Sequence, residues 1–206
     1  MLTIWGRINS INVMKVLWIC AELNLAYQRV DAGMQHGVVD TDEYGAMNPN
    51  RRVPTVRDGD FALWESNTIV RYLAARERAT QWLPDAPRAR ADAERWMDWS
   101  TSTLAAPMTT LFWQLIRTPV ERRDPAAIER STAETALCFE LLARQLAARE
   151  ALCGASPTVA DIAIAPFVHR WLALPIDHPK LPALEAYFRR MMTRPAFRQH
   201  VALPLT

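Results

Sequence analysis

The sequence predicts a small α/β domain followed by an all-helical domain, and three observations support this. Short β-prone runs alternate with helical periodicity only in the first 80 or so residues. Strand signals stop after the proline-bearing stretch TQWLPDAPRARAD, which we interpret as a linker. Apolar residues then recur at helical spacing almost to the end of the chain. We therefore divide the chain into residues 1–80 and residues 88–206.

The first domain begins with a β-α-β pattern. Residues 2–5 (LTIW) are a short β-prone run, and apolar residues from Val13 to Leu23 recur at i, i+3, i+4 and i+7, which is the spacing of a helix. The following stretch, AYQRVDAG, alternates between apolar and polar residues, as a strand does. Strands separated by a helix are usually parallel neighbours, so we expect these two to pair in parallel.

A β-β-α pattern completes the domain after a long, partly helical connection over Gly33–Asn50. Two short strands flank the Asp58-Gly59 turn, and a helix is predicted from about Ser66 to Arg78. A tight turn makes the last two strands antiparallel, so the sequence predicts a mixed four-stranded sheet with helices on its faces.

The second domain is predicted to contain helices only. Helical spacing covers residues 88–117, 125–150, 158–172 and 180–192, and prolines stand between these segments or at their ends, where proline is tolerated. The T-x-x-D sequence from Thr158 to Asp161 predicts a capping box at the start of the third helix. On that helix we expect His169 and Trp171 to pack rather than bind a ligand.

Composition excludes several classes of function. The net charge is +2 and neither half is strongly basic, so nucleic acid is not an indicated partner. No stretch has the length of a membrane span and the N-terminus has no signal-peptide pattern, so we expect a soluble, cytoplasmic protein. Cys20, Cys138 and Cys153 lack the spacing of a disulfide framework or a zinc site, so we expect no metal and interpret the cysteines as small buried hydrophobes.

Pro54 is the first candidate site residue, because it lies where a strand is predicted and proline cannot donate to the ladder of a sheet. Three interpretations remain open from the residues alone. Pro54 could lie on an edge strand, it could begin a strand with a trans bond, or the Val53–Pro54 bond could be cis and turn the backbone of Val53 outward.

Glu65 and Ser66 follow Pro54 by 11 and 12 residues and precede a predicted helix. Ser66 suits an N-cap of a helix beginning at Asn67, which would stabilise the helix by about 1 kcal/mol. The same helix end would attract a carboxylate, while Glu65 would attract an ammonium group. The pair could therefore cap a helix or hold a ligand that carries both charges.

The loop between the first strand and the first helix holds two polar candidates, Ser10 and Asn12. Either could simply cap the helix. A hydroxyl at a helix N-terminus could also donate to a bound thiolate, and lowering a thiol pKa by two units corresponds to about 2.7 kcal/mol. In that case Ser10 would donate a hydrogen bond to the sulfur and would not itself attack a substrate.

These motifs together resemble the cytosolic glutathione S-transferases, in particular the serine-type, theta-like and bacterial members. The resemblance rests on V-P at Val53, E-S at Glu65, the serine loop and the T-x-x-D box, and it covers the whole chain. It implies a thioredoxin-like first domain, glutathione as co-substrate and a homodimer. Asn12-Val13-Met14 replaces the Pro-Cys-Arg expected after a theta-type serine, so Asn12 rivals Ser10 as the sulfur donor.

The resemblance also implies roles for the remaining site residues. Pro54 would be cis and would present the backbone of Val53 to the cysteinyl part of glutathione, as in β-augmentation. Glu65 and Ser66 would hold the γ-glutamyl end of the peptide. Arg52 is the best local cation for the glycyl carboxylate, although a solvated loop arginine is the alternative.

The resemblance implies an enzyme that activates the glutathione thiolate for attack on an electrophilic, often hydrophobic substrate, with a role in detoxification. One face of the helix after the linker would wall an apolar pocket for that substrate. The alternatives are another glutathione-dependent reaction, such as peroxide reduction, isomerisation, dehalogenation or ether cleavage, or a non-catalytic binding or regulatory protein. The candidates for the pocket wall on that helix are Trp96, Trp99, Thr103, Pro107, Phe112 and Trp113.

Overall fold

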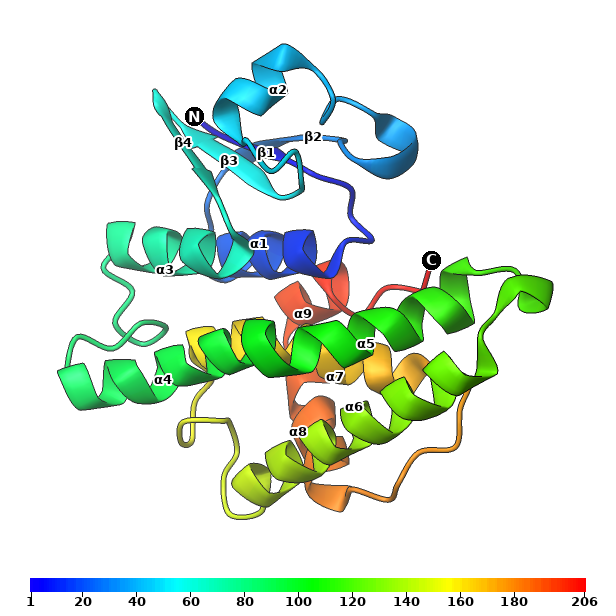
Figure 1. Cartoon of the computed structure of the whole chain (residues 1–206). Coiled ribbons are helices and arrows are strands. Elements are labelled where there is room, and N and C mark those ends of the chain that lie inside the picture. Colours follow the sequence, from blue (N-terminus) through cyan, green and yellow to red (C-terminus); the bar gives the residue numbers. More distant parts are fainter.

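A computed structural model describes all 206 residues and places an α/β half above a helical half (Figure 1). The strands are β1 (Leu2–Trp5), β2 (Tyr27–Val30), β3 (Thr55–Asp58) and β4 (Phe61–Trp64). The helices are α1 (Ile11–Glu22), α2 (Asp42–Met47), α3 (Ser66–Arg76), α4 (Pro87–Trp99), α5 (Ala105–Phe112), α6 (Pro125–Leu146), α7 (Val159–Ala173), α8 (Pro182–Met192) and α9 (Pro195–His200). The predicted fold class is confirmed, with strands in the first part of the chain only.

The four strands form one mixed sheet in the order β2-β1-β3-β4. β1 pairs in parallel with β2 and antiparallel with β3, and β3 pairs antiparallel with β4 across the Asp58 turn, as the sequence predicts. Side chains alternate between the faces of a strand, so Leu2 and Ile4 enter the main core while Trp5 packs with Tyr44 of α2 on the opposite face. Figure 1 shows α1 and α3 side by side beneath the sheet and α2 above it.

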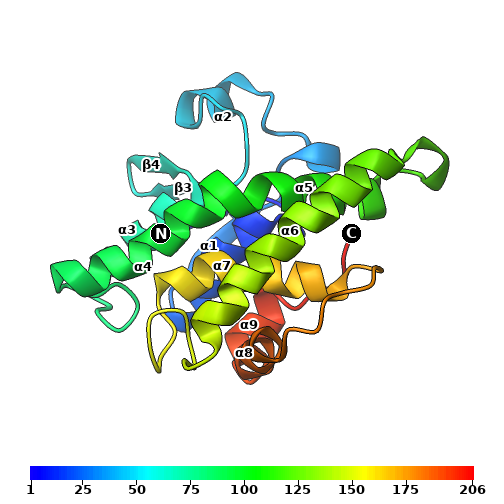
Figure 2. The same cartoon turned by 60° about the horizontal axis from the view of Figure 1, so that its bottom comes forward.

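A long rod dominates the helical half. α4 and α5 are joined without a break through a π-helical segment at Ser100–Leu104, and a second π-helical segment at Trp113–Arg117 continues the rod. α7 lies in the middle of this half and contacts both α4 and α1, as two views of the molecule show (Figures 1 and 2). π-helical turns are rare and often occur at functional sites, so the residues of both segments are candidates for such a site.

The structure refines the sequence prediction around the expected linker. α4 begins at Pro87, one residue before the helical spacing predicted from residue 88, because proline suits the first turn of a helix. Trp82 and Leu83, which lie in the expected linker, are buried. The short helix α9 was not predicted, although Pro195 occupies its first turn in the same way. The two-domain division at residues 1–80 and 88–206 stays a prediction, because one cluster of 43 buried residues runs through both halves.

The predicted capping box is confirmed at the start of α7. The fully buried carboxylate of Asp161 accepts hydrogen bonds from the backbone N–H groups of Thr158 at 2.8 Å and Leu152 at 3.1 Å, and from the hydroxyl of Tyr187 at 3.0 Å. Burial raises the pKa of Asp161 despite these donors. The box therefore joins α7 to the preceding loop and to α8.

The residues expected to pack do so. The ring of Trp171 stacks on Phe139 with 5.0 Å between ring centroids, and Nε2 of His169 lies 2.8 Å from the carbonyl oxygen of Leu203. Cys20 is fully buried on α1, and burial raises the pKa of its thiol to about 12. Cys20 is therefore a core residue rather than a reactive thiol.

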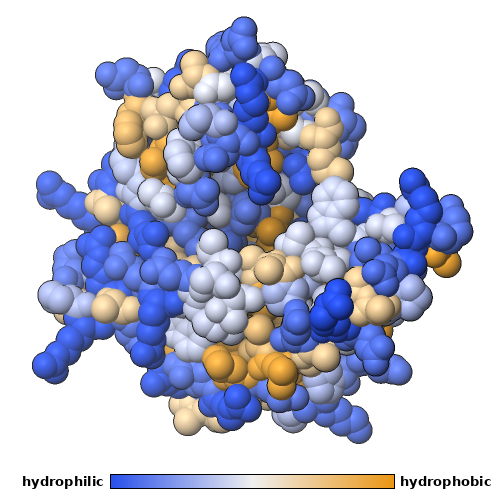
Figure 3. Space-filling model, in the orientation of Figure 1, coloured by the Kyte–Doolittle hydropathy of each residue, from blue (hydrophilic) through white to orange (hydrophobic).

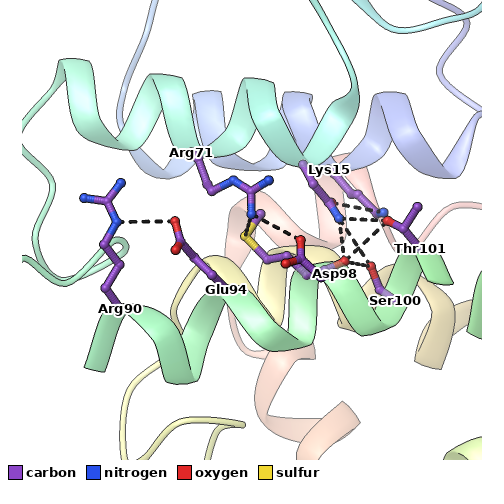
Figure 4. A network of polar contacts seen from close by, with 9 residues as sticks. Lys15, Arg71, Arg90, Glu94, Asp98, Ser100 and Thr101 are labelled. Carbon is purple, nitrogen blue, oxygen red and sulfur yellow. Dashed lines mark hydrogen bonds and ion pairs between the residues drawn. The ribbon is translucent and has the colours of Figure 1, made fainter. Parts of the chain in front are cut away.

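A buried polar network joins the two halves (Figure 4). The side-chain amide of Asn67 on α3 donates to the carbonyl of Met97 on α4 at 2.7 Å, and the ammonium of Lys15 on α1 donates to the amide oxygen of Asn67 at 3.4 Å. Near the surface, Arg71 and Asp98 form an ion pair at 3.5 Å. Burial lowers the pKa of Lys15 to about 7, so this cation lies in an unfavourable environment between the halves.

Candidate functional site

Two adjoining cavities open in the cleft between the halves, on the face that Figure 3 shows hollowed between the upper and lower parts of the molecule. The first has a volume of about 470 Å³, and we name it the proline cavity. The second, of about 390 Å³, we name the arginine cavity. The proline cavity is lined by Asn12, Asn48, Asn50, Arg52, Val53, Pro54, Trp64, Glu65, Ser66 and Thr101. The arginine cavity is lined by Arg7, Asn9, Ser10, Ile11, Asn12, Gly33, Met34, Val39, Arg51, Arg52, Val53, Thr109, Trp113, Arg117 and Arg170.

Pro54 lies just before β3, and the Val53–Pro54 bond is cis. Pro54 therefore stands outside the sheet ladder, which begins at Thr55. The backbone N–H and C=O of Val53 form no hydrogen bond within the protein, and Val53 lines both cavities. Since backbone groups are rarely left unpaired, Val53 offers one free donor and one free acceptor to a bound molecule.

A polar network fixes the residues on either side of Val53. The carbonyl of Arg52 accepts from the hydroxyl of Tyr44 at 2.7 Å and from the side-chain amide of Asn48 at 2.8 Å. The same two side chains reach the hydroxyl of Thr55 at 2.8 and 2.9 Å. Sequence reasoning missed Tyr44 and Thr55, since neither belongs to a recognisable motif.

Glu65 and Ser66 form the opposite wall of the proline cavity at the start of α3. Glu65 is the N-cap with a φ of 71°, and Ser66 is the first helical residue, one position earlier than the sequence suggests. The hydroxyl of Ser66 makes no capping bond, and the carboxylate of Glu65 forms no ion pair. A non-glycine residue held at positive φ is typical of ligand sites. The pair thus offers a free carboxylate beside the free N–H groups of a helix end.

The two neighbouring arginines before Val53 differ in their surroundings. Arg51 donates to the carbonyls of Val39 at 3.1 Å and Thr41 at 2.8 Å, so it fastens the connection before α2. Arg52 is exposed, donates no hydrogen bond to the protein and lines both cavities. The guanidinium of Arg52 is therefore the one available to a ligand.

Ser10 and Asn12 lie where the cavities adjoin, at the N-terminus of α1. Ser10 is the N-cap residue, but its hydroxyl makes no capping hydrogen bond, and only 8% of the residue is exposed. Asn12 is exposed in the first turn and lines both cavities, whereas Ser10 lines the arginine cavity. Both side chains can thus donate to a molecule bound at this helix end.

The arginine cavity departs from the apolar wall expected for it. The long rod contributes Thr109, Trp113 and Arg117, while two other expected wall residues, Trp96 and Phe112, are buried in the core. Both π-helical segments reach the cleft, because Thr101 lines the proline cavity and Trp113 lines the arginine cavity.

Three arginines give this cavity its electrostatic character, and sequence reasoning missed all of them. Arg7 comes from the β1–α1 loop, Arg117 from the second π-helical segment and Arg170 from α7. Burial, with repulsion from Arg117 and Arg7, lowers the pKa of Arg170 to about 9. Burial also lowers the pKa of Arg7 and of Arg117. Arg170 could have been noticed as the one arginine or lysine within the mostly apolar helix VADIAIAPFVHRWLA.

The described chain offers little support for other kinds of site. No group of three or more His, Cys, Asp or Glu side chains is placed to hold a metal ion. None of the helices combines the length and the apolar character needed to cross a membrane.

Comparison with known proteins connects both halves to one family. Residues 1–75 match the family model described as "Glutathione S-transferase, N-terminal domain". Residues 125–190 match the one described as "Glutathione S-transferase, C-terminal domain". The matches agree with the order of the two halves in the structure.

Individual relatives match over most or all of the chain. The chain is 42% identical over 208 residues to "Glutathione S-transferase GstB" of Escherichia coli strain K12, which covers 100% of both chains. It is 30% identical over 162 residues to "Glutathione S-transferase theta-3" of Mus musculus, covering 75% of this chain and 67% of the relative. The crystal structure of a theta class glutathione S-transferase from Xanthomonas axonopodis pv. citri, with glutathione bound, superimposes with a TM-score of 0.96 at 42% identity, covering 100% of this chain and 99% of that one.

Proposed function

The chain belongs to the glutathione S-transferase family, and we propose that Ser10 activates the thiol of glutathione as a thiolate for attack on an electrophile bound beside it. Glutathione is the co-substrate of this transferase, as it is in the related enzymes. The observation that carries the proposal is the free hydroxyl of Ser10 at the N-terminus of α1, where the two cavities adjoin.

In this proposal the proline cavity binds glutathione. The free backbone N–H and C=O of Val53 pair with the cysteinyl residue of the peptide. The γ-glutamyl end carries an ammonium and a carboxylate, which suit the carboxylate of Glu65 and the helix N-terminus at Ser66. Arg52 binds the glycyl carboxylate, because it is the cation of this wall that no other residue engages.

The cysteinyl sulfur would then lie beside the N-terminus of α1. Only about 3% of a free thiol is ionised at neutral pH, because its pKa is about 8.5. Donation from the hydroxyl of Ser10, together with the free N–H groups of the helix end, stabilises the charged sulfur. The bound thiolate forms a bond to an electrophilic atom, and positioning of the two reactants supplies the rest of the rate gain.

The choice between Ser10 and Asn12 is tested by two alanine variants. Ser10→Ala should lower kcat/KM with 1-chloro-2,4-dinitrobenzene by about 100-fold, the usual effect of removing a donor to a developing anion. Asn12→Ala should lower it by less than about tenfold. Ser102→Ala is the matched control, because Ser102 is an exposed serine that lines neither cavity. Loss of turnover in Asn12→Ala with full turnover in Ser10→Ala would assign the sulfur donor to Asn12.

The proposal includes the oligomeric state, the cellular location and the physiological role of the protein. We expect a homodimer of the two-domain subunit, divided at residues 1–80 and 88–206, that acts in the cytoplasm in detoxification, as the family resemblance implies. The exposed ring of Phe61 on β4, packed against the partly buried Tyr72 on α3 with ring centroids 5.4 Å apart, is an apolar feature suited to an intersubunit contact. Sedimentation at the mass of two chains supports the dimer, and a single-chain mass at micromolar concentration contradicts it.

A further inference from the structure

We propose that the arginine cavity selects a second substrate that carries a carboxylate, so that this transferase acts on anionic electrophiles. The inference rests on the proposed attack by glutathione thiolate, and it adds the chemical class of the molecule attacked. It departs from the apolar second-substrate pocket that the sequence led us to expect.

The charge of the cavity lining is the first observation. Five of its lining residues are arginines and none is an aspartate or glutamate, although the whole chain has a net charge of only +2. Arg51 is engaged by backbone carbonyls and Arg52 faces the proposed glycyl carboxylate. Arg7, Arg117 and Arg170 remain, and together they form what we name the arginine triad.

The second observation is that no acidic side chain pairs with the triad. None of the ion pairs in the structure includes Arg7, Arg117 or Arg170. Nε of Arg7 is buried without any hydrogen-bond partner. Buried charges in proteins are normally paired, because an unpaired charge loses its hydration without compensation. Arg170, the buried member of the triad, therefore lacks an acidic partner, and an anion bound in the cavity would supply one.

The contacts of the triad are with aromatic rings and main-chain oxygens rather than with acidic side chains. The guanidinium of Arg170 lies 3.8 Å from the ring centroid of Phe112, and that of Arg117 lies 5.0 Å from Phe112 and 4.9 Å from Trp113. Arg117 also donates to the main-chain oxygen of Thr206, the last residue of the printed sequence, at 3.1 Å. Aromatic faces hold guanidinium groups while leaving N–H donors free for a carboxylate. Arg170 is 93% buried, whereas Arg7 and Arg117 are partly buried, so the triad reaches from the core into the cavity.

The triad lines the same cavity as the residues proposed to hold the glutathione sulfur. Ser10 and Asn12 line the same cavity as the three arginines. A carboxylate held by the triad would keep the rest of the molecule inside the cavity, beside the proposed thiolate. The volume of about 390 Å³ is sufficient for a small aromatic or aliphatic acid.

A matched pair of electrophiles tests the selection. In 4-chloro-3-nitrobenzoate the glutathione sulfur forms a bond to ring carbon 4, the carbon–chlorine bond breaks, chloride leaves with the bonding electrons, and the thiol proton passes to solvent. The corresponding benzamide reacts identically but is neutral. We expect the wild-type protein to accelerate the benzoate reaction over its uncatalysed rate at least about tenfold more than the benzamide reaction.

Variants connect that preference to the triad. Arg117→Gln and Arg7→Gln should each lower the ratio of kcat/KM for benzoate to kcat/KM for benzamide by about tenfold or more. Arg122→Gln is the matched control, since Arg122 is an exposed arginine near Arg117 in the chain that lines neither cavity. An unchanged ratio with both reactions slowed equally would show that the arginines serve the thiolate, and it would overturn the proposal.

A binding measurement separates this proposal from the proposed function. Calorimetry with the unreactive pair 3-nitrobenzoate and 3-nitrobenzamide, in the presence of glutathione, should give at least about tenfold tighter binding of the benzoate. If the benzoate binds more tightly than the benzamide but neither electrophile is consumed, the result supports the anion site and contradicts the proposed thiolate attack. If both electrophiles are consumed without preference for charge and the benzoate binds no more tightly than the benzamide, the transferase stands and the anion site is overturned.

Discussion

The proline cavity and the arginine cavity share a cleft but differ in the charge of the groups that line them. In the proline cavity, the carboxylate of Glu65, a helix end at Ser66 and free backbone groups at Val53 offer both signs of charge at separated points. The arginine cavity offers only positive charge, from side chains brought together from distant parts of the chain. A mixed wall suits a zwitterionic peptide such as glutathione, and a purely positive one suits an anion.

The difference extends to how each site is built. The proline cavity depends mainly on backbone geometry within the α/β half, namely a cis bond before β3 and a positive φ before α3, and Thr101 is its one lining residue from the helical half. The arginine cavity depends on side chains held by Phe112 and Trp113 of the helical half. We infer that substitutions in the helical half would alter which second substrate is accepted, while the main glutathione-binding residues stay unchanged.

The largest expected effect concerns Lys15, because one residue of each cavity, Glu65 and Arg170, acts on its charge. Glu65 attracts its charge and Arg170 repels it, while burial is the main reason that its pKa is lowered to about 7. The unfolded chain therefore holds one more proton than the folded protein between about pH 7 and 10.5, so the stability that Lys15 contributes rises with pH in that range. Below pH 7 its burial costs up to about 5 kcal/mol.

We expect Lys15→Met to raise the free energy of unfolding at pH 6 by about 2–3 kcal/mol, after allowing for the unpaired amide oxygen of Asn67. The gain should shrink as the pH rises from 7 to 10. Urea unfolding of wild type and variant across this range measures it, with Lys180→Met as the control at an exposed lysine. A gain of equal size at pH 6 and pH 10 would refute the account of Lys15.

Glu65→Gln is expected to have a smaller effect, which is limited to glutathione binding. Removing the charge while keeping the shape should raise KM for glutathione by about 10-fold to 50-fold, since one charge-assisted hydrogen bond is lost. The preference for the charged over the neutral electrophile should stay as in the wild type, because the arginine triad is intact. Glu43→Gln is the control at an exposed glutamate on α2 that forms no ion pair. A parallel loss of charge preference would mean that the two cavities do not act separately.

Most of the fold could be predicted from the sequence, because it depends on local periodicity. The strand and helix order follows from apolar spacing, whereas the cis bond at Pro54 was expected only from the family resemblance. The capping box at Thr158 and Asp161 is likewise a local pattern, and it is confirmed. What local patterns missed was mostly short or at a boundary, such as the helix α9.

The arginine cavity could not be predicted for a different reason. Arg7, Arg117 and Arg170 are far apart in the sequence, and only the packing of α1 and α5 around α7 brings them together. Lys15 was missed because it lies off the apolar stripe predicted for α1. Lys15 lies on a second face of α1, and this face is also buried, because α7 of the helical half packs against α1.

The state of bound glutathione tests the central claim most directly. The ultraviolet absorbance of the thiolate, measured for the wild-type protein with glutathione and corrected for each component alone, reports the ionised fraction as the pH is raised. The account predicts that the pKa of the bound thiol lies about two units below the value of about 8.5 for a free thiol. A bound thiol that titrates near 8.5 would contradict it, and would leave a protein that holds glutathione without activating it.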